Sequence, residues 1–157
     1  MALLTPSIIT LQVNSKNTTE FVPGTGESNG QLTLSDHSRS PLQTSFDTIE
    51  SPQRMADGTM RKYVIANKKR VSCSWTMLPT ISSMVVDGKA NALAVKRFYE
   101  INYPYDMTMK LYYKKNAAQD LSYVETISIY WESMSFDVVK RYNDFDYWNI
   151  NAEFVEI

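Results

Sequence analysis

The amino-acid sequence predicts a mainly-β protein, either a β-sandwich or a partly open barrel, with one flanking α-helix and a long extended N-terminal arm. Three observations favour this class. Several runs after residue 61 alternate apolar and polar residues, one segment has helical periodicity, and residues 14–60 are poor in large apolar residues. The 157 residues correspond to about one domain, and 19 aromatic residues are enough to build a core.

Residues 1–60 are predicted to form an arm, and residues 61–157 the β-sandwich domain. Between residues 14 and 60 the chain is rich in Gly, Ser, Thr and Asn, and its apolar residues are too scattered to offset the entropy of ordering. Two short runs in the arm are typical of strands, one at residues 8–13 and one at residues 31–35. We therefore expect neighbouring subunits to order the arm.

The domain is expected to open with a strand that ends at Pro79. Val71, Cys73, Trp75 and Met77 alternate with hydroxyl-bearing residues, which is the pattern of a half-buried strand. Cys73 lies on the apolar face of this pattern, so we expect a buried thiol rather than a reactive one. Because it is the only cysteine, an intramolecular disulfide is excluded.

A helix is predicted at about residues 87–102. Asp87 is a good N-cap residue, and Pro104 is a strong signal for the end of the helix. Between them, apolar residues recur at helical spacing, namely Ala90, Leu93, Ala94, Phe98 and Ile101. We expect this stripe to face the core.

Three strands are predicted to complete the domain. The first spans residues 107–113, and a polar connection at residues 115–120 has the length of a hairpin loop. The return strand changes its apolar parity near Glu132 and Ser133, which predicts a β-bulge at that point. The last strand shows its alternation over residues 147–154 and is expected to run to the C-terminus. Five large aromatic residues on the apolar parities are expected to meet between sheet and helix: Trp75, Trp131, Phe136, Trp148 and Phe154.

Few residues in the chain are suited to catalysis. The single histidine, His37, lies in the polar arm, and no serine or cysteine accompanies it in a pattern typical of a nucleophile. Asp144 and Asp146 could together face a cation, but a calcium loop needs several further oxygen ligands, so a polar turn is the favoured interpretation. We predict that the protein is not an enzyme and that it uses no cofactor and no metal.

Charge is distributed unevenly along a chain whose formal net charge is −1. Residues 54–70 contain six basic residues and one acid, and residues 142–157 contain four acids and no basic residue. The basic run could be a solvated face, a contact between subunits, or a nucleic-acid site, although few aromatic residues accompany it. The candidates for a subunit contact are Lys68, Lys69, Arg70, Asp144 and Asp146.

Three stretches of the chain together resemble a known protein family over roughly residues 61–157. The first is Arg70-Val-Ser-Cys-Ser-Trp75-Thr-Met-Leu-Pro79, which is followed by Val86-Asp87-Gly88. The second is the helix ending Arg97-Phe-Tyr-Glu100, and the third is the closing Lys140-Arg-Tyr-Asn-Asp-Phe-Asp-Tyr-Trp148 with the acidic strand Asn151-Ala-Glu-Phe-Val-Glu156. This combination is similar to tail proteins of tailed bacteriophages, of the tail-tube and distal-tail kind. The resemblance implies a β-sandwich with one helix that forms rings, usually hexameric, stacked around a DNA channel, with arms that reach into neighbouring subunits.

The resemblance makes a tail-tube subunit the leading functional expectation. Such a protein is a non-catalytic structural component of the virion, assembled in the host cytoplasm, and its partners are further copies of itself and other tail proteins. It contacts the passing DNA without sequence specificity. No run approaches the ~20 apolar residues of a membrane span, so no membrane partner is expected. The alternatives are a distal-tail, tail-completion or baseplate ring protein, and a non-catalytic β-sandwich binding module.

Overall fold

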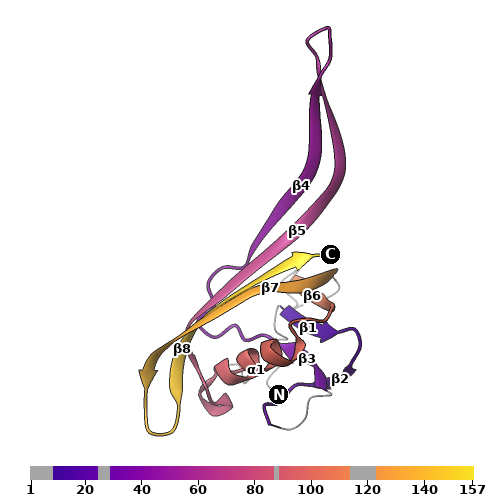
Figure 1. Ribbon diagram of the computed structural model, residues 1–157. Coiled ribbons are helices and arrows are strands. Elements are labelled where there is room, and N and C mark those ends of the chain that lie inside the picture. The colour runs from indigo at the N-terminus through magenta and orange to yellow at the C-terminus, as the bar shows by residue number, and fades with distance from the viewer. Residues whose placement is uncertain (1–8, 25–28, 87–88, 114–122) are drawn as a thin grey trace.

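A single open sheet of eight strands and one helix make up the computed structural model (Figure 1). The structure describes residues 9–24, 29–86, 89–113 and 123–157. The strands are β1 (Ile9–Val13), β2 (Asn17–Glu20), β3 (Asn29–Thr33), β4 (Gln43–Arg54), β5 (Met60–Pro79), β6 (Met107–Tyr113), β7 (Tyr123–Arg141) and β8 (Asp146–Glu156). The helix α1 spans Ala92–Asn102, and a short 3-10 helix spans Ser82–Met84. The predicted mainly-β class with one helix is confirmed.

The strands lie in the order β2-β3-β1-β6-β7-β8-β5-β4, and every pair except β2–β3 is antiparallel. The segment after β3 returns to β5, where Arg39 forms an isolated bridge with Trp75 and the Trp75 indole donates to the Ser35 carbonyl at 2.7 Å. This segment therefore lies against β5, although β3 and β5 are not neighbours in the sheet. The sheet is curled as in a partly open barrel.

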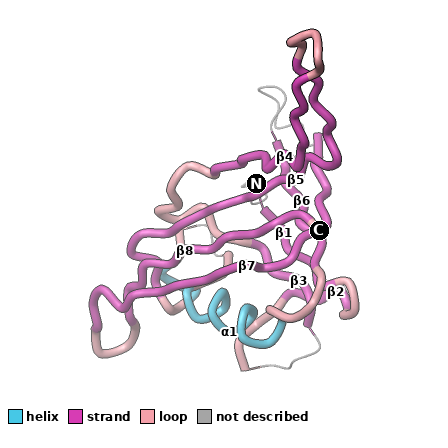
Figure 2. Tube along the Cα trace, turned by 45° about the horizontal axis from the view of Figure 1, so that its top comes forward, coloured by secondary structure: helices cyan, strands magenta, loops and turns pink. Residues whose placement is uncertain are grey.

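The core lies between this curled sheet and α1, which runs along one face of the sheet (Figure 2). Phe98 of the helix is fully buried, and its ring lies 5.6 Å from Phe21 and 6.2 Å from Trp131. Trp131 in turn lies 4.8 Å from Phe154. Trp75, Trp131, Trp148 and Phe154 are all buried, as predicted.

Phe136 is the exception, because it is 41% exposed, so its predicted burial is wrong. The bulge predicted near Glu132 is confirmed, since the register of β7 shifts between Trp131 and Ser133. Beyond the bulge, the Phe136 ring stacks at 4.9 Å on Trp148, and the ammonium of Lys96 lies 5.8 Å from its centre. The margin of α1 covers this ring only in part.

The helix begins later than the sequence predicted. Asn91 is the N-cap, and its side-chain oxygen accepts from the backbone N–H of Ala94 at 2.9 Å. Asp87, the predicted N-cap, lies outside the described residues, as does the predicted connection at residues 115–120. The end at Asn102, before Pro104, is confirmed. Leu93 was expected on the buried stripe, but it is 39% exposed.

The predicted strand before Pro79 is longer than expected and ends irregularly. Strand β5 has 20 residues, and its register with β8 shifts between Trp75 and Leu78. Met77 lies at this shift with φ at 58°, and its backbone N–H donates to the Asn149 side chain at 3.0 Å. Met77 is therefore only half-buried, and Leu78 takes the core position that alternation predicted for Met77.

The first part of the expected arm lies in the body of the same chain. Strand β1 pairs with both β3 and β6, and its residues Ile9, Leu11 and Val13 are fully buried. Leu32, which is the register partner of Leu11, and Leu34 are almost equally inaccessible. For residues 9–34 the structure thus differs from an extended arm, because period-two apolar residues complete the face on which α1 packs. Of the predicted arm, only the part that begins with β4 at Gln43 projects from the body (Figure 1).

Candidate assembly surface

The most conspicuous feature of the molecule is a long hairpin, formed by β4 and the first half of β5, that projects away from the body (Figure 1). Its turn is well defined: the Met55 N–H donates to the Thr59 carbonyl at 2.7 Å, and Gly58 supplies the required positive φ of 88°. The carboxylate of Asp57 accepts from the hydroxyl and N–H of Thr59, which lowers the pKa of Asp57. The turn is therefore held by its own local hydrogen bonds.

All twelve residues of β4 are exposed, and the hairpin carries large apolar side chains in water. The most exposed of these side chains are Phe46, Ile49, Met60, Tyr63, Val64 and Ile65. The register places Phe46 and Val64 on one face of the hairpin and Ile49 and Tyr63 on the other. Ile65, at the shift of register, is 75% exposed. Since apolar side chains are exposed on both faces, a single covering element could not bury all of them.

Strand edges without a partner accompany these apolar faces. Strand β4 is an edge of the sheet over its whole length. Strand β7 has a second free edge: its pairing with β6 ends at Ile129, so within the described residues its stretch 130–141 is paired on one side only. This stretch also exposes apolar side chains, Phe136, Val138 and Val139. Long exposed apolar edges are templates for strand addition, which soluble monomers normally avoid.

The predicted basic contact residues lie at the root of the hairpin, where β5 meets β8. Lys68 donates to the carbonyl oxygen of Ile157, and Lys69 forms an ion pair with Glu125. Arg70 forms ion pairs with carboxylates of its own chain. The structure therefore shows that these cations already have partners within the subunit.

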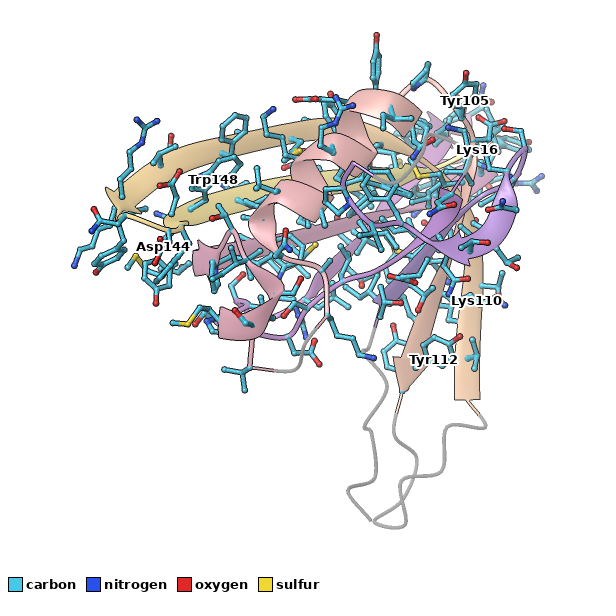
Figure 3. The ribbon with its side chains drawn as sticks, turned by 90° about the horizontal axis from the view of Figure 1, so that it is seen from below. Lys16, Tyr105, Lys110, Tyr112, Asp144 and Trp148 are labelled. Carbon is cyan, nitrogen blue, oxygen red and sulfur yellow. The ribbon has the colours of Figure 1, made fainter. Side chains whose placement is uncertain are left out.

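The predicted acidic contact residues lie at the other end of the sheet. Asp144 is in the turn between β7 and β8 (Figure 3), and Asp146 begins β8. The Asp146 backbone N–H donates to the Thr80 hydroxyl at 2.9 Å, and its carboxylate accepts from the Trp148 indole at 3.4 Å. Pro79, which pairs with Tyr147, lies nine positions along β5 from Arg70, so roughly 30 Å lies between the two charged groups. One subunit does not bring them together.

The residues considered for catalysis have structural partners. Burial raises the pKa of the Cys73 thiol to about 12, so the thiolate is scarce at neutral pH. The Nδ1 atom of His37 accepts from the Val86 N–H at 3.0 Å. No group of three or more metal-ligating side chains occurs among the residues that the structure describes. In that same part of the chain, no helix is long and apolar enough to cross a membrane.

A hollow of about 600 Å³ lies over β5, β8 and β7, between them and the segment that leads into β4. Its lining is mainly hydroxyl and amide, with Ser72, Ser74, Ser133, Ser135 and Asn151. The one charged residue in this lining, Glu153, faces Arg70 at 3.8 Å. The hollow therefore offers no acid–base pair for a reaction.

The sequence contained one signal for the hairpin that our prediction did not use. Asp57-Gly58 is a strong hairpin-turn dipeptide, and it separates two runs that can pair without a large apolar face. The free edge of β7 had no comparable signal, because it depends on where β6 stops. A strand edge is a property of pairing, not of one strand's own residues.

No family model matches this sequence, and no curated protein matches it. Among the solved structures that match, two align with nearly the whole chain at low similarity. One is the tail of an empty GTA particle with C6 symmetry: the TM-score is 0.48 at 9% identity, and the match covers 95% of this chain and 90% of that one. The other is the anti-feeding prophage cap, which terminates a tube: the TM-score is 0.40 at 15% identity, covering 99% and 91%. Both are phage-tail-like proteins. At this level of similarity they identify no role for this chain.

Proposed function

We propose that the chain is a structural subunit of a bacteriophage tail tube that assembles with copies of itself into stacked rings around the DNA channel. The observation that carries this proposal is the β4–β5 hairpin, whose apolar side chains are exposed on both faces and whose outer strand is an unpaired edge. In a monomer this hairpin leaves its apolar side chains in water and its strand edge unpaired, so it adds little to stability. An assembly in which neighbours cover the hairpin buries its apolar surface and removes its edge.

The positions of the two apolar edges, those of β4 and of the stretch 130–141 of β7, support a ring rather than a two-fold dimer. The edge of β4 and the edge of β7 lie on different strands of one sheet, separated by β8 and β5. A contact that pairs one edge with the other joins unlike surfaces, so it repeats from subunit to subunit until the ring closes. In this proposal the ring is a homohexamer, located in the virion after assembly in the host cytoplasm.

The proposal assigns no catalytic role to the chain. Its support is the state of the reactive side chains, since the Cys73 thiol is buried and His37 holds a backbone N–H. The partners are further copies of the chain and other tail proteins, and no cofactor is required. A distal-tail, tail-completion or baseplate role would use the same surfaces in a single ring. A binding module would leave the hairpin uncovered.

Electron microscopy and light scattering of the purified full chain test the proposal. We expect the wild type to form filaments with a central channel, and the double variant Phe46→Ser, Ile65→Ser to remain monomeric with an unchanged fold. Val22→Ser is the matched control, because Val22 is an apolar residue of the body that is 49% exposed. Closed single rings would favour the distal-tail or completion role. A wild type that stays monomeric at high concentration would reject self-assembly.

A further inference from the structure

The root of the hairpin contains an unusual arrangement of charge around two consecutive residues, Lys69 and Arg70. The pairing of β5 with β8 begins at Arg70, opposite Val155, so these residues mark the place where the hairpin leaves the body. As neighbours on a strand, their side chains point to opposite faces of the sheet. The two cations therefore engage the body from both sides.

On one face, Arg70 contacts carboxylates from three other strands. Its Nε lies 3.3 Å from Asp47 of β4, and its terminal nitrogen forms an ion pair with Glu132 of β7 and lies 3.8 Å from Glu153 of β8. The contacts with Asp47 and Glu132 raise the pKa of Arg70, a guanidinium that is charged at any working pH. A planar guanidinium with five N–H donors is suited to such a shared contact, which a point-like ammonium is not.

On the other face, Lys69 connects the hairpin to the middle of the body. Its ammonium forms an ion pair with Glu125 of β7, whose second oxygen accepts from the Tyr113 hydroxyl of β6 at 3.1 Å. Its backbone N–H donates to the Glu156 carboxylate of β8 at 2.8 Å. Lys69 and Glu125 have side chains that are only 28% and 22% exposed, so solvent screens this pair less than an ordinary surface pair.

We propose that Lys69 and Arg70 form an electrostatic clamp that sets the direction in which the hairpin projects. Among the described residues, no further strand pairs with β4 or β5 beyond this point, so the angle of the hairpin to the body depends on this root. The clamp orients the arm before a neighbour arrives, which lowers the ordering cost of association. Its effect on assembly rests on the proposed function, whereas its effect on the arm of a single subunit does not.

The rest of the basic run supports this division of roles. Arg54 and Arg61 lie near the tip of the hairpin, and neither forms an ion pair within the described residues. Lys62 forms only a pair within the hairpin, with Glu50. Cross-strand contacts to the body are thus confined to the root. The basic run therefore has two parts that the sequence does not distinguish. The cations at the root contact the body, and those at the tip are exposed.

A distance measurement between spin labels tests the clamp on the full chain at concentrations below assembly. One label is placed at Ala56→Cys in the turn and one at Leu93→Cys on the exposed side of α1; buried Cys73 stays unlabelled. We expect one narrow distance distribution for the wild-type background and at least a twofold broader one for Lys69→Gln, Arg70→Gln. Arg61→Gln, on the same strand without an ion pair, is the matched control and should leave the width unchanged.

Two further measurements complete the test: the distance distribution at high salt and the protein concentration needed for assembly. In 1 M salt, where screening acts within ~3 Å, the wild-type distribution should broaden toward that of the double variant. The concentration needed for assembly should rise about tenfold in the double variant. If the double variant does not fold, Arg70→Gln alone is measured and should broaden the distribution to a smaller degree. Equal widths in wild type and folded variants would overturn the clamp. A narrow wild-type distribution without any assembly would reject the proposed function and leave the clamp standing.

Discussion

Two parts of the first sixty residues, both of which lie in the predicted arm, have opposite surroundings. Strands β1 and β3 are buried in the body on alternate residues, whereas every residue of β4 is exposed. The two regions differ in the faces on which their apolar side chains lie. Ile9, Leu11 and Val13 lie on one face, so α1 and the sheet can cover them, but Phe46 and Ile49 lie on opposite faces of the hairpin. Apolar content alone does not identify an arm.

The comparison also explains why the body and the hairpin should respond differently to the same substitution. A side chain buried in the body loses its contacts and leaves a cavity when it is truncated. A side chain of the hairpin has no contacts to lose until a neighbour covers it. Stability should therefore report on the body, and assembly on the hairpin.

The largest difference in stability is expected between two single variants, each of which truncates one phenylalanine. Phe98→Ala should lower the free energy of unfolding by ~3–5 kcal/mol, because the fully buried ring packs against Phe21 and Trp131. Phe46→Ala, at a ring that is 57% exposed, should change it by less than ~0.5 kcal/mol. Urea unfolding followed by tryptophan fluorescence measures both. Equal losses would show that the hairpin is part of the core.

A somewhat smaller effect tests whether β1 belongs to the body. Leu11→Ala should destabilise the monomer by ~2–5 kcal/mol, since Leu11 is fully buried between β3 and β6. The matched control is Ile49→Ala in β4, with an expected change below ~0.5 kcal/mol. A Leu11→Ala variant as stable as the wild type in dilute solution would restore the view that residues 9–34 are an arm.

Proteolysis should distinguish the two regions in kinetic terms. Trypsin should cleave unassembled protein first at Arg54, Arg61 and Lys62, because local opening at an exposed hairpin tip costs little. We expect those cuts at least tenfold faster than any cut in the body, with mass spectrometry identifying the sites. In assembled protein the same cuts should slow, since neighbours then cover the hairpin. Early cleavage within β1 or β3 would contradict the comparison.

The thiol of Cys73 reports on the exclusion of water from the body. Burial raises the pKa of Cys73 to about 12 from an ordinary 9.0, so the unfolded chain releases this proton at a lower pH than the folded one. Stability should therefore fall as the pH rises above about 9, by about 1–2 kcal/mol at pH 10. Cys73→Ala should lack this decline. Placing Ile49→Cys in that background should yield a thiol that a disulfide reagent labels rapidly, whereas Cys73 in the wild type reacts only on unfolding.

The smallest effect is expected at the acidic end of the sheet. Exposed ion pairs contribute only ~0–1 kcal/mol each, and charge acts mainly on the rate of encounter. Asp144→Lys should slow assembly two- to threefold at low salt without changing the stability of the monomer. Asp146→Lys would also remove the hydrogen bond that the Trp148 indole donates to Asp146, so it could change the stability of the monomer as well. Light scattering at two salt concentrations measures the rates, and equal rates would remove Asp144 from the subunit contact.

Local patterns in the sequence determined much of the body. The alternation in residues 71–75 and 147–154 predicted two central strands with their buried faces, and the change of parity after Trp131 predicted the bulge. The end of the helix before Pro104 followed from the same kind of signal. These features depend on neighbours within a few residues, through backbone geometry and the period of side chains on a strand or helix. The local sequence therefore contains the information needed to predict these features.

Long-range pairing decided the rest, because it depends on where other strands begin and end. The burial of β1 needs β6 and α1 as partners, and the exposure of Phe136 depends on how far α1 covers β7. The free edge of β7 exists because β6 stops opposite Ile129, and the cations at Lys69 and Arg70 are neutralised by acids 56 and 62 residues away in the chain. Charge and polarity are visible in the sequence. Which charges meet, and which apolar faces remain uncovered, is set by the register of strands distant in the chain.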